Sequence, residues 1–284
     1  MELGAKSCVA AAFALAGALG CGDGTSGWIL TENASVGAGA PDAAVQQDAG
    51  HDALFEAGIP PSGRFPRNPE DFGSVCSPEL TIQNRTSDGN WRLFRDAFPD
   101  LPEYMLATTK RCCALLYKTP NEVARTRHLT LLIEDFQGAG YMQDDGDQTL
   151  VRLSAVYMRN LATNGDSVRD EVGGILHYLL GIDYSWHNEN PDAVRWLSQG
   201  IGEWVRHQAR QGAINRRRPG GHWTDGYETT GYFLDWLTER YPDAVYLLNK
   251  SLDPRDGIYW DERAFEYITG QTLPDLWNAY QQSI

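Results

Sequence analysis

Two stretches of the sequence decide the fold class. Residues 128–135 read HLTLLIED, and residues 168–182 read VRDEVGGILHYLLGI. The first is short and rich in leucine and β-branched side chains, which is typical of a strand. The second is longer and repeats its apolar side chains at helical spacing. We therefore expect a sheet early in the folded region and helices after it.

The flanking sequence shows the same division. Strands are predicted at 80–84, where apolar side chains alternate along LTIQN, and at 150–156, with a turn at 138–140. A single helix is predicted over 91–118. Beyond Ser167 only helices are expected, over 168–182, 193–211, 229–240, 244–252, 260–269 and 273–281. Strands followed by helices indicate the α+β class.

Composition excludes some classes of protein. The chain has 284 residues, of which 42% are hydrophobic and 22% charged, so it can build a sizeable core. It carries 38 acidic and 24 basic side chains, and its formal net charge is -14. A general nucleic-acid binder needs basic groups to neutralise phosphates, so we expect no nucleic-acid partner.

The N-terminus has the features of an export signal. Lys6 precedes an apolar run over 8–19 that is too short to span a bilayer. The run ends in Ala18-Leu19-Gly20-Cys21, which resembles the bacterial lipobox, in which the cysteine becomes the lipidated first residue. We expect residues 1–20 to be a signal peptide and lipid on Cys21 to anchor the chain to the membrane of the cell envelope. The alternative is a secreted protein in which Cys21 is an ordinary thiol.

Residues 21–69 are predicted to be a flexible tether. The segment is rich in Gly, Ala, Asp and Pro, and from Gly22 to Gly63 it has six carboxylates and no lysine or arginine. It has no sustained hydrophobic period with which to bury a core. The folded domain is therefore expected to occupy residues 70–284.

Three further cysteines belong to this domain. Export favours their oxidation. Cys112 and Cys113 are adjacent on a predicted helix, so a bond between them would be strained, whereas Cys76 can reach either one. We favour a Cys76–Cys112 disulfide; reduced, buried thiols are the alternative.

Seven blocks of the domain resemble, in order, the basic secretory protein family. They lie at 80–85, 129–141, 153–157, 171–176, 196–206, 226–234 and 276–280. The resemblance implies a zincin-like fold, in which a small twisted sheet packs on an active-site helix and a helical half follows. It also implies descent from secreted zinc peptidases.

The zinc-binding motif of that family is missing. The family has His-Glu-x-x-His on the helix after the block at 171–176, where two histidines one turn apart bind zinc and the glutamate activates water. Here Tyr178 occupies the first histidine position, Leu179 the glutamate position and Ile182 the second histidine position. Gln199 replaces a further acidic ligand, and an amide is a poor zinc ligand beside a carboxylate. We therefore expect no metal cofactor and no catalytic residue, and we expect the old site to have closed into core.

Four polar or aromatic residues of the family's cleft are retained. Glu203 stands where the family has an aspartate, and we expect it to pair with Arg206 or with nearby groups; its spacing from His207 fits a helix ion pair better than a metal site. His222, Trp223 and Tyr227 match the family's cleft region. We interpret these three residues as mainly structural, with ligand binding as the alternative.

Three functions remain open. The favoured one is an exported, lipid-anchored protein that has lost peptidase activity and binds a peptide or glycan of the envelope, or acts as a scaffold. The second is a metallohydrolase whose site was rebuilt from His177, His187, His222 and nearby carboxylates. The third is a purely structural lipoprotein.

Overall fold

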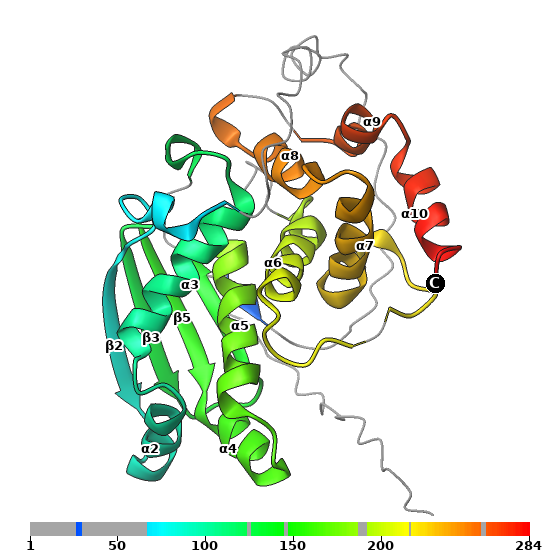
Figure 1. The fold of residues 1–284 in the computed structure, drawn as a ribbon. Coiled ribbons are helices and arrows are strands. Elements are labelled where there is room, and N and C mark those ends of the chain that lie inside the picture. The colour runs from blue at the N-terminus through cyan, green and yellow to red at the C-terminus, as the bar shows by residue number, and fades with distance from the viewer. Residues whose placement is uncertain are drawn as a thin grey trace, which may run out of the picture.

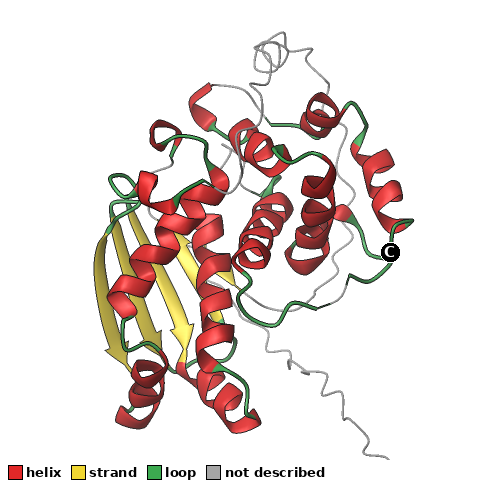
Figure 2. Cartoon of the chain, viewed as in Figure 1, coloured by secondary structure: helices red, strands yellow, loops and turns green. Residues whose placement is uncertain are grey.

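The computed structural model describes residues 27–29 and 67–284, except 124–125, 145–146, 187–191, 216 and 257–259. The predicted signal peptide, residues 1–20, and the predicted lipid site, Cys21, lie outside these residues. The fold is α+β, as expected: a mixed sheet with helices on one face is followed by a helical half (Figures 1 and 2). No helix within the described ranges is both long and apolar enough to cross a membrane.

The sheet has the strand order β1-β4-β5-β3-β2. Strands β2 (Glu79–Arg85), β3 (His128–Glu134) and β5 (Gln148–Ser154) run parallel, with Leu129 opposite Leu80 and Thr149. Strand β4 (Gly140–Asp144) is antiparallel to β5, and β1 (Gly27–Ile29) is antiparallel to β4. The parallel pairs require crossover connections, which helices supply between β2 and β3.

Helices α2 (Asp88–Ala97) and α3 (Leu101–Leu116) replace the single helix predicted over 91–118, which was wrong. Pro99 separates them, because a proline lacks the N–H of the helix ladder and disfavours helical backbone at the preceding residue, here Phe98. Phe94 and Phe98 are buried, with ring centroids 5.2 Å apart. Phe98 also contacts Tyr104 of α3, with ring centroids 5.0 Å apart, so an aromatic contact spans the break.

Three strands or helices were missed, of which β1 lies within the segment predicted to be a flexible tether. Strand β4 occupies residues beyond the predicted turn at 138–140, and α4 (Ala155–Asn164) begins inside the strand predicted at 150–156. Ser154 ends β5 and caps α4, because its side chain accepts a hydrogen bond from the Tyr157 N–H. Because Ala155-Val156 continues the apolar pattern of the strand, the sequence does not show that a helix begins here.

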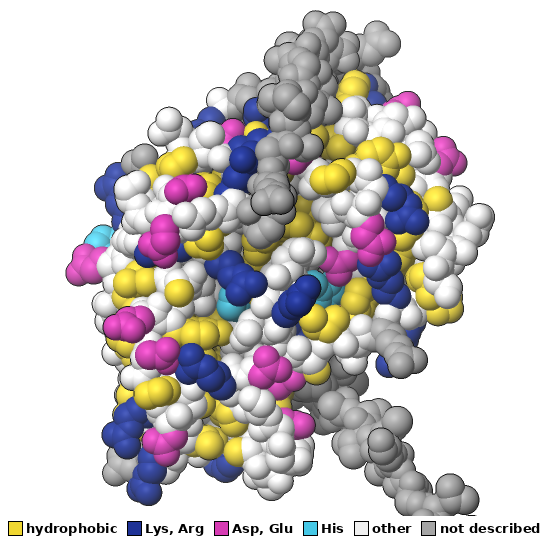
Figure 3. All heavy atoms as spheres, viewed as in Figure 1, with side chains coloured by type: hydrophobic (Ala, Val, Ile, Leu, Met, Phe, Trp, Pro, Cys, Tyr) yellow, Lys and Arg dark blue, Asp and Glu magenta, His cyan; other side chains and the backbone are white. Residues whose placement is uncertain are grey.

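Helix α5 (Val168–Asp183) lies between the sheet layer and the helical half, where Figure 1 places it beside α3 and α6. The helical half consists of α6 (Arg195–Ala209), α7 (Tyr227–Arg240), α8 (Ala244–Ser251), α9 (Arg263–Thr269) and α10 (Leu273–Gln281). All five were predicted to within a few residues. Charged side chains of both signs are interspersed on the face drawn in Figure 3.

The disulfide joins Cys76 to Cys113, so the favoured Cys76–Cys112 pairing was wrong. Thr109, one turn before Cys113, donates a hydrogen bond to the Cys76 carbonyl at 2.7 Å, so this face of α3 is turned toward Cys76. Cys112, the residue before Cys113, points to another side of the helix. Its thiol is free, fully buried and directed at the His177 carbonyl of α5. Helix rotation, which adjacency in sequence does not reveal, decides the pairing.

We expect Cys113→Ala to lower the free energy of unfolding by about 3–4 kcal/mol, because the bond closes a loop across a separation of 37 residues. Cys112→Ala should keep the disulfide and cost only the loss of a small buried side chain, about 1 kcal/mol. Urea denaturation combined with peptide mapping measures both effects. A mapped Cys76–Cys112 bond in the wild-type chain would contradict the assignment.

Candidate functional site

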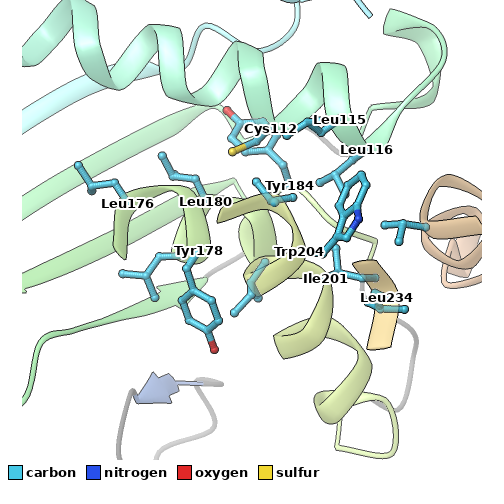
Figure 4. Close-up of a cluster of buried hydrophobic side chains, with 14 of the residues drawn as sticks. Cys112, Leu115, Leu116, Leu176, Tyr178, Leu180, Tyr184, Ile201, Trp204 and Leu234 are labelled. Carbon is cyan, nitrogen blue, oxygen red and sulfur yellow. The ribbon is translucent and has the colours of Figure 1, made fainter. Parts of the chain in front are cut away.

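Helix α5 carries the residues at the family's motif positions into the protein interior. Tyr178 is 4% exposed, and Leu179 and Ile182 are completely buried. Figure 4 shows Leu180 on the side of α5 nearest α3, with Tyr178 directed to the opposite side. His177 also belongs to the α3 side, because its ring stacks edge-on against Tyr104. Tyr178, at the first histidine position, therefore lies on the side of α5 that faces the helical half.

Ile182 fills the space between α5 and α6. A Cβ atom added to Gly202 of α6 would lie 2.7 Å from Ile182 Cγ1 and 2.7 Å from the Tyr178 carbonyl oxygen. Gly181 makes the reciprocal approach, with its added Cβ 2.9 Å from Val205 Cβ. The two helices thus touch through glycines at the level of Ile182, and the Ile182 side chain is packed in the core between them.

Tyr178, Tyr227 and Gln199 form one cluster. The Tyr178 and Tyr227 rings stack at 6.0 Å between centroids, and the Tyr227 hydroxyl is hydrogen-bonded to the Gln199 side chain. Burial raises the pKa of Tyr178 well above its usual value, and nearby Tyr227 and Glu203 raise it further. Tyr178 therefore stays a neutral phenol, and the residues at two former ligand positions are joined through Tyr227.

Tyr227 is held in an unusual backbone conformation. Its φ of 42° lies in the left-handed region, which a bulky residue seldom adopts and which costs about 1–3 kcal/mol. The preceding Gly226 has φ 72° and lies against the Gln199 amide, where an added Cβ would be 2.2 Å from Oε1. Contacts with Tyr178 and Gln199 offset this strain.

Glu203 belongs to a buried charge network. Its Oε1 atom lies 2.8 Å from Arg206 Nη1 and 3.2 Å from His207 Nε2, and Glu203 is 3% exposed. The pairing with Arg206 was expected. On the other side of the imidazole, His207 Nδ1 lies 2.6 Å from Asp235 Oδ2 of α7. Burial alone lowers the pKa of His207, but hydrogen bonds to Asp235 and Glu203 raise it to about 9.

Both ring nitrogens of His207 therefore face carboxylates. The Tyr232 ring stacks on the imidazole at 4.7 Å between centroids and covers its face. Burial raises the pKa of Glu203, yet His207 and Arg206 together hold it below its usual value. The network is an imidazolium between two carboxylates, closed on one face by an aromatic ring.

Arg206 also fastens the segment after α6. Its guanidinium donates to the Gln211 carbonyl at 3.3 Å and to the Ala213 carbonyl, while the Ala213 N–H donates to Glu171 Oε1 at 2.7 Å. Gly174 of α5 permits this close approach, since an added Cβ would lie 2.9 Å from the Gln211 carbonyl oxygen. The network thereby joins α5, α6, α7 and the segment that follows α6.

His222 and Trp223 lie nearer the surface. Their ring centroids are 3.7 Å apart, His222 is exposed and Trp223 half-buried against the core. Trp223 begins the short helix η3 (Trp223–Asp225), which leads directly into Tyr227. Among the retained cleft residues, Glu203 is therefore buried, Tyr227 and Trp223 are half-buried, and His222 is exposed.

The residues present do not fit the zinc that the resemblance implies. Leu179 and Ile182 have no donor atom, the Tyr178 phenol is neutral, and Gln199 is engaged with Tyr227. In the part of the chain that the structure describes, no three His, Cys, Asp or Glu side chains are arranged to hold a metal ion.

The groups proposed for a rebuilt site do not form a site among the described residues. His177 donates to the Gly173 carbonyl at 2.8 Å, and burial lowers its pKa to about 4. His222 stacks on Trp223 instead, and His187 lies outside the described residues. Asp183, the carboxylate four residues before His187, accepts hydrogen bonds from Thr126 and Thr149.

A family model described as a peptidase of plants and bacteria, BSP, matches residues 78–280. The chain belongs to the basic secretory protein family. The match spans β2 to α10, and so covers the sheet, the charge network and the residues at the former motif positions. No curated protein and no solved structure matches the chain.

Sequence reasoning missed two members of the network of this basic secretory protein, Asp235 and Tyr232. Both lie on α7 next to Gly231, whose added Cβ would be 2.7 Å from Glu203 Cβ. Once α6 and α7 are known to touch at Gly231, Asp235, one turn later, must lie near His207. No local pattern in the sequence predicts the contact between α6 and α7.

We expect the free energy of unfolding to fall at alkaline pH because of the charge network. The pKa of His207 is raised from 6.5 to about 9, so its stabilising effect is complete below pH 6.5 and is lost as the pH rises through 9. The free energy of unfolding should fall over that range by about 3 kcal/mol more in the wild type than in His207→Gln. Urea denaturation at pH 6 and pH 9.5 measures this difference.

The matched control is His222→Gln, which changes an exposed histidine and should keep the wild-type pH dependence. If His207→Gln and the wild type lose the same amount of stability between the two pH values, His207 is not held as an imidazolium.

Proposed function

We propose that this basic secretory protein is an exported, lipid-anchored binding module of the bacterial cell envelope that has lost zinc and peptidase activity. The observation that carries the proposal is the packing of the motif positions: Ile182 against Gly202, and Tyr178 against Tyr227. Close packing at these positions supports the loss of a metal and of its attacking water. Peptide hydrolysis by this family's route needs both groups.

The aromatic pair of His222 and Trp223 supports a role in binding. The faces of His222 and Trp223 are of the kind that stack on a sugar ring or on an apolar peptide side chain. The pair lies next to Tyr227, whose strained backbone persists although no metal chemistry needs it. We therefore place a peptide or glycan ligand against η3 and the start of α7.

Export and anchoring rest on the N-terminal sequence. The apolar run over 8–19 and the Leu19-Gly20-Cys21 ending support cleavage before Cys21 and lipid on its thiol. The Cys76–Cys113 disulfide agrees with an oxidising compartment. A single lipid-modified terminus followed by the acidic segment would hold the domain at the membrane surface.

We expect the purified mature chain to contain much less than one zinc per molecule and its melting temperature to be the same with and without a chelator. The reason is that the motif positions supply no zinc-binding set of side chains. Metal analysis by mass spectrometry and thermal unfolding measure the two quantities. Added zinc should raise the melting temperature no more than added magnesium.

Near-stoichiometric zinc, with a melting temperature that drops on chelation, would overturn the loss of the metal site and support the rebuilt metallohydrolase. Binding is tested separately, through the tryptophan fluorescence of the mature chain titrated with soluble envelope glycan fragments and with peptides. Trp223→Ala should abolish the response, while Trp91→Ala, on α2, should keep it. A response that survives Trp223→Ala would place the ligand elsewhere.

A further inference from the structure

The β4 edge of the sheet is covered by a segment from far earlier in the chain. Strand β1 pairs with β4 in antiparallel register, Gly27 opposite Gln143, Trp28 opposite Met142 and Ile29 opposite Tyr141. Without β1, the outer backbone groups of β4 would form an open edge, which is a template for another strand. Figure 1 places this short blue strand close to α5.

The edge that receives β1 is rigidly supported. An added Cβ at Gly140 would lie 2.9 Å from the Arg152 carbonyl oxygen of β5 and 3.2 Å from Ile175 Cγ2 of α5. Strand β4 is therefore fixed by β5 on one side and by α5 on its face. A strand that pairs with it is fixed relative to the whole domain.

The position of β1 in the sequence has a geometric consequence. Only residues 22–26 separate Cys21 from Gly27, so at 3.3–3.6 Å per residue the two lie at most about 20 Å apart. A fully flexible segment over 21–69 would instead give a root-mean-square span of roughly 35–40 Å and a much longer reach. Pairing of β1 thus shortens the tether to its first few residues.

We propose that residues 27–29 act as a clamp in cis, which closes the β4 edge and holds the domain close to the membrane with this edge turned toward the lipid anchor. The part about the membrane rests on the proposed lipidation of Cys21; the docking of the strand does not. Residues 30–66 form a covalent link between the strand and the domain, which keeps the strand at high effective concentration near its edge.

Cysteine cross-linking tests the docking of the strand. In the full mature chain with Cys21→Ser, Gly27→Cys and Gln143→Cys should form a disulfide under mild oxidation, because their Cα atoms are direct partners. The matched control pairs Gly27→Cys with Thr81→Cys on β2, at the opposite edge and four strand spacings, roughly 19 Å, away.

Peptide mapping should show the first bond forming at least tenfold faster than the second. Equal rates would mean that residues 27–29 are not held against β4, and would overturn the clamp. Failure of the first bond to form, in a chain whose Cys76–Cys113 bond maps normally, would overturn it as well.

Energy transfer tests the distance to the membrane. A donor dye on Asn160→Cys, on exposed α4, reports its distance from acceptor lipids in vesicles that carry the lipidated chain. Trp28→Pro/Ile29→Pro should lower the transfer, because successive residues direct their N–H groups to opposite edges and one of the two must face β4. Ala43→Pro/Ala44→Pro, outside the strand, should leave the transfer unchanged.

The two assays separate the two proposals. If the Cys21→Ser chain cross-links at 27 and 143 but the chain that keeps Cys21 does not float with vesicles, lipid anchoring is disproved and the strand docking is kept. A chain that floats but transfers energy equally with and without the proline pair disproves the clamp and keeps the anchor.

Discussion

The helical half depends on close approach between three helices. Helix α6 touches α5 through Gly202 and touches α7 through Gly231, where added Cβ atoms would lie 2.7 Å from neighbouring side-chain atoms. An alanine at either position would force the backbones apart, and overpacking of this kind usually costs 1–3 kcal/mol. Because the helices touch in this way, Ile182, Tyr178 and Glu203 have fixed partners.

The charge network joins side chains from two helices. In a zinc peptidase, a metal joins side chains from separate helices. Here Glu203 and His207 of α6 form an ion pair, His207 is hydrogen-bonded to Asp235 of α7, and Arg206 extends the network to the segment that follows α6. Breaking such a buried set by removing one partner is strongly destabilising, since the remaining charge stays buried. The network therefore joins α6 to α7 and to the segment that follows α6.

Much of the fold could be predicted from the sequence, and its gaps have physical causes. Helices α5 to α10 were predictable because each carries an apolar face at helical spacing. Strand β4 and helix α4 were not, because a short strand resembles the turn that precedes it and Ala155-Val156 reads like a continued strand. The break between α2 and α3 was marked by Pro99 and was overlooked.

The candidate site was predictable where it depended on position within a helix. The burial of Leu179 and Ile182 and the pairing of Glu203 with Arg206 follow from their places on α5 and α6. The role of Asp235 depends on how α7 meets α6, and the stacking of Tyr178 on Tyr227 depends on a left-handed residue. These are contacts between elements, which a linear pattern does not contain.

The two neighbouring cysteines of α3 bear on how the chain matures. During oxidative folding, Cys76 meets two adjacent thiols, and only rotation of α3 into its native packing presents Cys113 rather than Cys112. Once packed, Cys112 is buried, and burial raises the pKa of its thiol, so it cannot attack the finished bond as a thiolate. A chain with a Cys76–Cys112 bond keeps the Cys113 thiol beside its disulfide and can still exchange. In the native chain the remaining thiol is buried, so packing favours exchange toward the native bond and stops it afterwards.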